Sequence, residues 1–297
     1  MLLLWSIENK GKTTLISPVP YMHYVKDHPH IIFHKNFGKF INKLTYRLVN
    51  FGLVKSVTYS QKWLANKDRR ATAKKIKKAF LDNSVIYTIS PSLFQRPEYW
   101  NANLKVLGFQ ERDKTRNWTP SIELDNFLQQ HSKFVFITFG SMINDCPEKK
   151  TETILKILES NKIAAIINTC AGGIIRPKNY PNPLIHFMEN IPYDWIFPKA
   201  HSVIHHGGSG TTHMALKYGC ANLIIPHIID QYVWNKIIHQ KGVGPLGIDI
   251  SKITINNLEP KIIDLISNKK YKDNAKKMSI DIQKENFKDE IYNSIIN

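Results

Sequence analysis

The stretch Val203-Ile-His-His-Gly-Gly-Ser-Gly-Thr-Thr-His-Met-Ala-Leu-Lys-Tyr-Gly219 decides the fold of this chain. Its apolar start is typical of a strand, its glycine-rich centre of a tight turn, and its last part of a helix. The first turn of a helix has free backbone N–H groups and the positive end of the helix dipole, and both attract anions. The glycines let a ligand come close to the backbone. The stretch therefore predicts a phosphate-binding turn at a strand–helix junction.

Two common phosphate-binding motifs do not match this turn. A P-loop needs a lysine at the start of its helix, and none stands there. The dinucleotide pattern Gly-x-Gly-x-x-Gly fits at Gly208 and Gly210, but His213 occupies its third glycine position. The predicted phosphate-binding turn is therefore neither a P-loop nor a dinucleotide-binding turn.

A metal site is the rival interpretation, because four histidines cluster in this part of the sequence: His201, His205, His206 and His213. Adjacent residues at a strand end point to opposite sides, so His205 and His206 do not easily face one ion. No cysteine pair or carboxylate completes a ligand set at the usual spacing. We therefore expect a phosphate ligand here and no metal.

The residues around this stretch alternate between strand and helix patterns. Strands are expected at 134–139, 164–168, 183–187, 203–206 and 222–226, and helices at 122–130, 148–159, 193–198, 211–218, 231–240 and 257–267. The strands are continuous apolar runs, which indicates burial on both faces. Such an alternation predicts an α/β domain with a parallel, doubly wound sheet, followed by a polar helical end at 269–297.

The first part of the chain has strand patterns at 13–17, 85–89 and 105–108, and basic helix patterns at 39–51 and 67–80. In the helix at 39–51, Phe40, Leu44 and Leu48 form an apolar stripe beside a basic one. We expect this apolar stripe to pack on its own domain, and contact with an anionic membrane is the alternative. The polar stretch 110–120 is typical of an interdomain linker. The predicted domains are therefore 1–117 and 118–297.

Composition describes a globular chain with a strong positive charge. The chain has 297 residues, 42% hydrophobic content and a net charge of +17. No apolar run approaches the roughly 20 residues of a membrane span, and the apolar start is too short for a signal peptide. The three cysteines are widely spaced, which favours a reducing cytoplasm. The charge fits either an anionic partner or a lysine-rich genome, and nucleic acid is disfavoured because no recognition motif accompanies it.

Polar residues also follow two other strands of the predicted sheet. Gly140 and Ser141 follow one strand, and Asp230 and Gln231 follow another. Ligands of open α/β sheets bind at the carboxyl ends of the strands. An aspartate beside a glutamine offers acceptors and donors that suit sugar hydroxyls. Together with the glycine-rich turn, these residues predict a ligand with a diphosphate and a sugar, which is a nucleotide sugar.

Residues 85–255 resemble the UDP-glycosyltransferases of the GT-B fold, and most closely the group of sterol 3-beta-glucosyltransferases and antibiotic glycosyltransferases. Four stretches carry this resemblance: Phe136 to Met142, Asn190 to Pro198, His205 to Thr212, and Pro226 to Gly244. The resemblance implies an α/β chain of the GT-B type, with two Rossmann-like domains of which the N-terminal one is incomplete. It also implies transfer of a hexose, with glucose as the expected sugar, from a UDP-sugar to a hydroxyl of a sterol, lipid or other apolar acceptor.

The resemblance also implies a set of donor-binding residues. His205, Ser209, Gly210 and Thr211 would hold the diphosphate, with Ser141 beside it. Asp230 and Gln231 would bind the hexose, and the loop around Ile191 to Tyr193 would meet the uracil. The expected site is Gly140, Ser141, Tyr193, His205, His206, Gly207, Gly208, Ser209, Gly210, Thr211, Asp230 and Gln231. No metal or other cofactor is implied. Asn190 and His213 depart from the plant-type members, which have a tryptophan and a glutamate at these positions.

The start of the chain departs further from the family. Its members begin with a glycine-rich loop that carries the histidine acting as general base, and no such opening precedes Ser17. The catalytic residue is therefore unknown, although the first part offers His23, His28, His30 and His34. The alternative function is an inactive or partner-dependent donor-binding module, either truncated or one half of a split enzyme whose partner chain supplies the acceptor site. We expect a cytoplasmic protein, with peripheral membrane contact as an option.

Overall fold

The computed structural model describes residues 2–33, 35–63, 70–111 and 118–296. The chain divides into two compact units, Met1–Gly108 with Asn286–Asn297, and Phe109–Glu285. The predicted domain boundary after residue 117 and most of the predicted linker lie outside the described residues. The last residues pack with the first unit, whereas the sequence analysis grouped them with the C-terminal domain.

The second unit is built on a five-stranded sheet in the order β6-β5-β4-β7-β8, and every pair of neighbours is parallel. All of its strands were predicted, with ends that shift by one or two residues. They are β4 (Val135–Thr138), β5 (Ala165–Asn168), β6 (Ile185–Met188), β7 (Ser202–His205) and β8 (Ala221–Ile224). Four of the five are buried throughout, as continuous apolar runs indicate.

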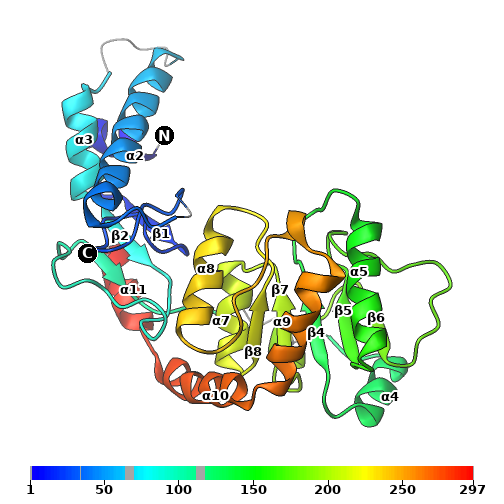
Figure 1. Ribbon diagram of the computed structural model, residues 1–297. Helices are drawn as coiled ribbons and strands as arrows, with labels where there is room; N and C mark the ends of the chain where they lie inside the picture. The colour runs from blue at the N-terminus through cyan, green and yellow to red at the C-terminus, as the bar shows by residue number, and fades with distance from the viewer. Residues whose placement is uncertain (1, 34, 64–69, 112–117, 297) are drawn as a thin grey trace. The chain divides into compact units, whose positions relative to one another are not determined.

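Helices cover both faces of this sheet (Figure 1). Alternate side chains of β4 divide between two cores, because successive strand residues point to opposite faces. Val135 and Ile137 lie in the core that includes residues of α5 (Pro147–Ser160) and α9 (Ile255–Ser267). Phe136 lies in the core of the other face. The other α-helices are α4 (Ile122–Gln130), α6 (Tyr193–Ile196), α7 (Ser209–Lys217), α8 (Ile229–Gln240) and α10 (Lys269–Lys284), and a short 3-10 helix spans Ile250–Lys252.

The strand order places a switch point between β4 and β7. From β4 the chain adds β5 and β6 on one side, and then β7 and β8 on the other. The loops that follow β4 and β7 therefore leave the sheet in opposite directions and open a crevice between them, where open α/β sheets bind ligands. The glycine-rich turn after β7 lies at this crevice.

The outer edge of β8 is covered by the segment 243–247. The backbone N–H of Asn222 donates to the carbonyl of Val243 at 2.9 Å. A Cβ atom on Gly244 or Gly247 would lie 1.7 Å from the carbonyl oxygen of Asn222 or Ile224 respectively. Only glycine permits so close an approach, and these two positions therefore depend on having no side chain.

The first unit contains a smaller parallel sheet in the order β1-β2-β3. Its strands lie where the sequence predicts them: β1 (Thr14–Ser17), β2 (Ser84–Tyr87) and β3 (Leu104–Val106). The helices of this unit are α1 (Leu2–Asn9), α2 (Lys39–Ser60), a short 3-10 helix (Gln61–Trp63), α3 (Ala73–Asp82) and α11 (Lys288–Ile296). The start of the predicted helix at 67–80 lies outside the described residues, and α1 was not predicted.

The apolar stripe of α2 is exposed, which corrects the expectation that it packs on its own domain. Phe40 is 83% exposed, and Leu44 and Leu48 are exposed as well. The helix instead buries Asn42, Thr45 and Tyr46. Thr45 accepts a backbone hydrogen bond from residue 30 at 2.8 Å, so a polar face is the one fixed to the rest of the unit. Periodicity identified the helix, but it could not show which of its faces has a partner.

Candidate functional site

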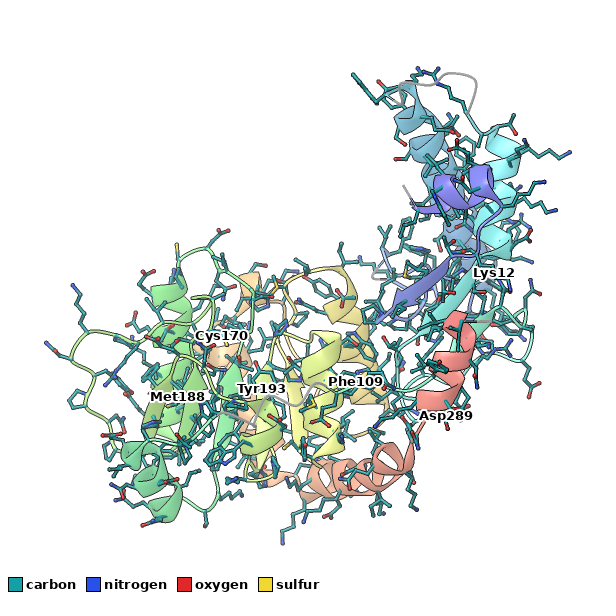
Figure 2. The ribbon with its side chains drawn as sticks, turned by 180° about the vertical axis from the view of Figure 1, so that it is seen from behind. Lys12, Phe109, Cys170, Met188, Tyr193 and Asp289 are labelled. Carbon is teal, nitrogen blue, oxygen red and sulfur yellow. The ribbon has the colours of Figure 1, made fainter. Side chains whose placement is uncertain are left out.

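A pocket of about 540 Å³ opens at the carboxyl ends of β4, β5, β6 and β7, within the second unit. Each of these strands contributes residues through the loop or helix that follows it. The lining residues are Phe109, Gln110, Gly140, Ser141, Asn168, Cys170, Ala171, Asn190, Ile191, Tyr193, Asp194, Gly210, Thr211 and Met214. Phe109, Cys170 and Tyr193, which come from three separate parts of the unit, are labelled in Figure 2.

Five of the predicted site residues line this pocket: Gly140, Ser141, Tyr193, Gly210 and Thr211. The other seven do not line it: His205, His206, Gly207, Gly208, Ser209, Asp230 and Gln231. The structure thus brings the loop after β4, the loop before α6 and the start of α7 together around one space. The geometry of the remaining predicted residues assigns several of them other tasks.

The N-terminus of α7 is open toward a ligand. Gly208 is its N-cap residue and has no side chain that could cap the free N–H groups of the first turn. The hydroxyl of Thr212 donates to the carbonyl of Gly208 at 2.9 Å and therefore does not act as a cap. Because Gly210 and Thr211 line the pocket, backbone donors of the first turn and the positive end of the helix dipole lie at its wall. This arrangement suits an anion such as a phosphate.

A buried hydroxyl holds the opposite wall in place. Thr138, the last residue of β4, accepts a hydrogen bond from the backbone N–H of Gly140 at 3.1 Å. Its hydroxyl also lies 3.1 Å from the hydroxyl of Tyr193 and 3.7 Å from the sulfur of Cys170. Burial raises the pKa of Tyr193, so its hydroxyl stays protonated. One threonine therefore ties three segments of the pocket together.

The side chain of His205 points into the protein. It is fully buried, its Nε2 lies 2.9 Å from Oδ1 of Asn222 on β8, and its Nδ1 accepts from the backbone N–H of Gly207 at 3.1 Å. Burial is the main reason why its pKa falls to about 3, so the ring is neutral. Both ring nitrogens are used, and this geometry does not support the predicted contact between His205 and the diphosphate. The residue instead shapes the glycine-rich turn.

His206 directly follows the last residue of β7, which is His205. The two rings are 6.4 Å apart and nearly perpendicular. The ring of His206 lies against Gly140 and Gly208, where an added Cβ would approach it to 2.9 Å and 2.5 Å. Its buried Nδ1 has no hydrogen-bond partner among the described residues. Of the two adjacent histidines, His206 is therefore the one whose ring keeps a nitrogen without a partner among the described residues.

Gln231 caps the start of α8. Its side-chain oxygen accepts from the backbone N–H groups of His227 and Ile228 at 2.7 Å and 3.2 Å, and its amide nitrogen lies 3.4 Å from the sulfur of Met142. The oxygen predicted to bind a hexose hydroxyl is thus occupied. Asp230 is only partly buried, and burial raises the pKa of its carboxyl. Asp230 remains the stronger candidate of the pair for a sugar hydroxyl.

His213 is fully buried and forms part of the core. Phe109 stacks on its ring at 4.9 Å, and its Nδ1 lies 2.7 Å from the carbonyl of Ser209 one turn earlier. Glu111 pairs with Lys217 and accepts a hydrogen bond from Tyr218 at 3.0 Å. Glu111, near the start of the predicted linker, is thus fixed to α7, and Phe109 just before it forms a wall of the pocket.

Sequence reasoning missed the residues that β5 contributes. Asn168 and Cys170 lie at and just after the end of that strand and line the pocket. The rule that ligands bind at the carboxyl ends of parallel strands would have found them, because the strand itself was predicted. No group of three or more His, Cys, Asp or Glu side chains in the described parts of the chain is arranged to hold a metal ion.

The comparisons with known proteins agree with this geometry. Residues 166–297 match a family model described as "Erythromycin biosynthesis protein CIII-like, C-terminal domain". The "Sterol 3-beta-glucosyltransferase UGT80A2" of Arabidopsis thaliana is 37% identical over 183 residues, which are 62% of this chain and 29% of that protein. The chain therefore spans well under two thirds of the length of this relative.

Solved structures show the same architecture. The glycotransferase of kitacinnamycin aligns over 98% of this chain and 72% of its own, with a TM-score of 0.67 and 14% identity. A UDP-glucose: anthocyanidin 3-O-glucosyltransferase in complex with UDP aligns over 95% and 68%, with a TM-score of 0.62 and 13% identity. The predicted α/β fold of the GT-B type is confirmed. By its fold the chain is of the GT-B type, and in sequence it is similar to the EryCIII-like C-terminal domain and to a sterol 3-beta-glucosyltransferase.

Proposed function

We propose that this chain binds a UDP-sugar in the second unit and serves the transfer of a hexose, with glucose as the expected sugar, to a hydroxyl of a sterol, lipid or other apolar acceptor. The observation that carries this proposal is the uncapped N-terminus of α7 at a pocket on the switch point of the sheet. The similarity to a sterol 3-beta-glucosyltransferase supports the sugar and the acceptor class.

For this reaction the site must stabilise UDP as the leaving group. Negative charge develops on the diphosphate as the bond to the sugar breaks, and preorganised donors placed there lower the barrier. The backbone N–H groups at Gly210 and Thr211, and the hydroxyls of Ser141 and Thr211, are donors in the pocket wall. We assign the nitrogen left on His206 to the same diphosphate, and Asp230 to the sugar. Residues 118–297 would then form the donor domain.

The alternative is a donor-binding module whose acceptor site comes from a partner chain. Two histidines of the first unit are held by their neighbours: His23 lies 2.5 Å from the hydroxyl of Tyr87, and His30 is buried against Tyr46. His34 lies outside the described residues. An acceptor screen with the purified chain separates the two proposals, because only the first expects sugar transfer without a second protein.

UDP and UDP-glucose are expected to raise the melting temperature of the chain, and the double variant Ser141→Ala/Thr211→Val is expected to lose most of this shift. Each lost hydrogen bond to a charged phosphate should weaken binding about tenfold. Calorimetric titration with UDP measures the affinity directly. Thr153→Val is the matched control, because Thr153 on α5 bonds to Lys149 and does not line the pocket. Equal UDP affinity in the double variant and the control would contradict the phosphate assignment.

We also propose that α2 places the chain on an anionic membrane surface, which would suit a lipid acceptor. Its exposed residues Phe40, Leu44, Leu48 and Phe51 recur at helical spacing along one stripe. Lys39, Lys43, Arg47 and Lys55 lie on the same helix, and an apolar stripe with basic flanks is typical of helices that lie in the membrane interface. No helix in the described parts of the chain is long and apolar enough to cross a membrane.

The chain is expected to float with vesicles that contain phosphatidylserine, and less so at high salt, because screening weakens the basic contribution. The variant Phe40→Ser/Leu48→Ser removes two exposed apolar side chains and should reduce vesicle binding at least tenfold. Ile263→Ser, on α9, is the control because Ile263 is also exposed but belongs to the second unit. Unchanged flotation of the α2 variant would disprove the membrane role of this helix.

A further inference from the structure

Four basic side chains of the second unit form a cluster away from the pocket. The basic cluster consists of Lys133, His201, Lys272 and Lys276, and none of these residues lines the pocket. Lys133 stands two residues before β4 and His201 directly before β7, while Lys272 and Lys276 lie one turn apart on α10. The pocket opens at the carboxyl ends of the strands, whereas the basic cluster lies at their amino ends.

Backbone contacts hold the basic cluster together around His201. The N–H of His201 donates to the carbonyl of Phe134 at 3.0 Å, which joins the starts of β7 and β4. The ammonium group of Lys272 donates to the carbonyl of Ala200, the residue before His201, at 3.2 Å. Burial is the main reason why the pKa of His201 falls to about 4, and the charges of all three lysines lower this pKa further. The three ammonium groups therefore surround a neutral imidazole ring.

The positive charge of the basic cluster is not balanced by a carboxylate. Within the described ranges, none of its lysines forms an ion pair. Lys133 donates to the carbonyl of Ile266 at 3.4 Å and Lys272 to that of Ala200, so each of these ammonium groups keeps two further N–H donors. Like charges that are held together repel one another, and an anion among them removes this cost.

The start of α10 adds to the positive field of the basic cluster. The helix has 16 residues, and Lys272 lies at the end of its first turn. The positive end of the helix dipole therefore lies beside the ammonium group of this lysine. Several donors that converge from three parts of the unit suit an anion with more than one negative charge and several acceptor oxygens. Phosphate groups have this chemistry, whereas chloride and a single carboxylate do not.

We propose that the basic cluster binds a phosphate group, as a second anion site separate from the donor pocket. Free phosphate anions and the headgroups of phospholipids present the same oxygens, and either source fits the donors described above. The inference goes beyond the proposed function and does not depend on it, because the two sites share no residue and lie at opposite ends of the strands.

The test follows the imidazole signals of the chain by NMR during titration with inorganic pyrophosphate at constant ionic strength. His201→Gln identifies the signal of His201, which its spectrum lacks. Pyrophosphate is expected to shift this signal in the wild-type chain until the site is saturated. Lys272→Gln/Lys276→Gln should weaken this binding at least tenfold, because each lost charge-assisted hydrogen bond should weaken it about tenfold.

The matched control is Lys277→Gln/Lys284→Gln, which removes the same charge from two exposed positions of α10 and should keep the wild-type affinity. The melting temperature of ligand-free Lys272→Gln/Lys276→Gln should equal or exceed that of the wild-type chain, because the variant relieves repulsion between like charges. A lower melting temperature together with unchanged pyrophosphate affinity would assign these lysines a purely structural role and overturn the proposal.

Two further titrations separate the sources of the phosphate and the two sites. Dihexanoylphosphatidic acid, a soluble phospholipid, is compared with pyrophosphate, and the probe that binds His201 more tightly identifies the source. Gly210→Ala should keep pyrophosphate binding at His201, because Gly210 belongs to the donor pocket alone. A His201 signal that neither probe shifts would overturn the proposal and leave the proposed function standing. Equal pyrophosphate affinity in the Lys272→Gln/Lys276→Gln variant and its control would overturn it as well.

Discussion

Gly210→Ala is expected to abolish donor binding while the chain stays folded. Gly210 lies in the first turn of α7 and lines the pocket, and no atom lies within 4 Å of the Cβ that alanine would add. The methyl group therefore costs nothing inside the protein, and alanine favours the helix over glycine by up to about 1 kcal/mol. It would, however, occupy the space through which a diphosphate reaches the N–H groups of the helix. We expect at least a hundredfold loss of UDP affinity and an unchanged or higher melting temperature.

Gly208→Ala is the contrasting variant, because it fails for a different reason. Its Cβ would lie 2.5 Å from Nε2 of His206, which is a clash with a buried ring. We expect this variant to lower the melting temperature before any ligand is added. If Gly210→Ala retained the UDP-induced shift of the wild-type chain, the diphosphate would not lie at the start of α7, and the proposed donor site would have to move.

The chain is expected to lose stability steeply as the pH falls below 6.5. Burial lowers the pKa of His205 to about 3 and that of His213 to about 4, whereas both titrate near 6.5 in the unfolded chain. Above pH 6.5 both states are neutral and the stability is fully present. Below pH 6.5 these histidines bind protons in the unfolded chain but stay neutral in the folded chain. The free energy of unfolding therefore falls by about 1.4 kcal/mol per pH unit for each histidine. The expected loss at pH 5 is about 4 kcal/mol for the two.

Urea unfolding between pH 7.5 and pH 5 measures this dependence. His213→Leu removes one of the two buried groups and should reduce the slope of stability against pH by about one proton. Phe197→Leu, at a fully buried position without a titrating group, should lower stability equally at every pH. The structure indicates that the buried histidines stay neutral in the folded chain. A wild-type stability that is constant between pH 6.5 and 5 would contradict this.

Most of the fold could be predicted because the decisive signals are local. The apolar run that becomes β7, the glycines after it and the helix pattern up to Gly219 all lie within seventeen consecutive residues. Continuous apolar strands between helices then indicate a parallel sheet without knowledge of the strand order. The resemblance to glycosyltransferases added the ligand class, and its fold is confirmed by the structural neighbours.

The direction of individual side chains could not be predicted, because it depends on partners far away in the sequence. His205 turns inward because Asn222 on β8 accepts from it, and that pairing exists only once β7 and β8 are neighbours. Gln231 is similar, since its oxygen is bound by the backbone of the loop before it. The exposed stripe of α2 depends on which face finds a neighbour, and periodicity carries no information about that.

The glycine-bearing segment along β8 has a consequence for how the chain behaves at high concentration. An outer strand normally offers unpaired backbone groups on which another chain can build. Here the carbonyls of Asn222 and Ile224 are approached by backbone at Gly244 and Gly247, and Pro245 between these two glycines has no N–H to offer a newcomer. Asn235 on α8 fastens this cover through two hydrogen bonds to Gly247. The segment 243–247 thus prevents a second copy of the chain from pairing with the edge strand β8.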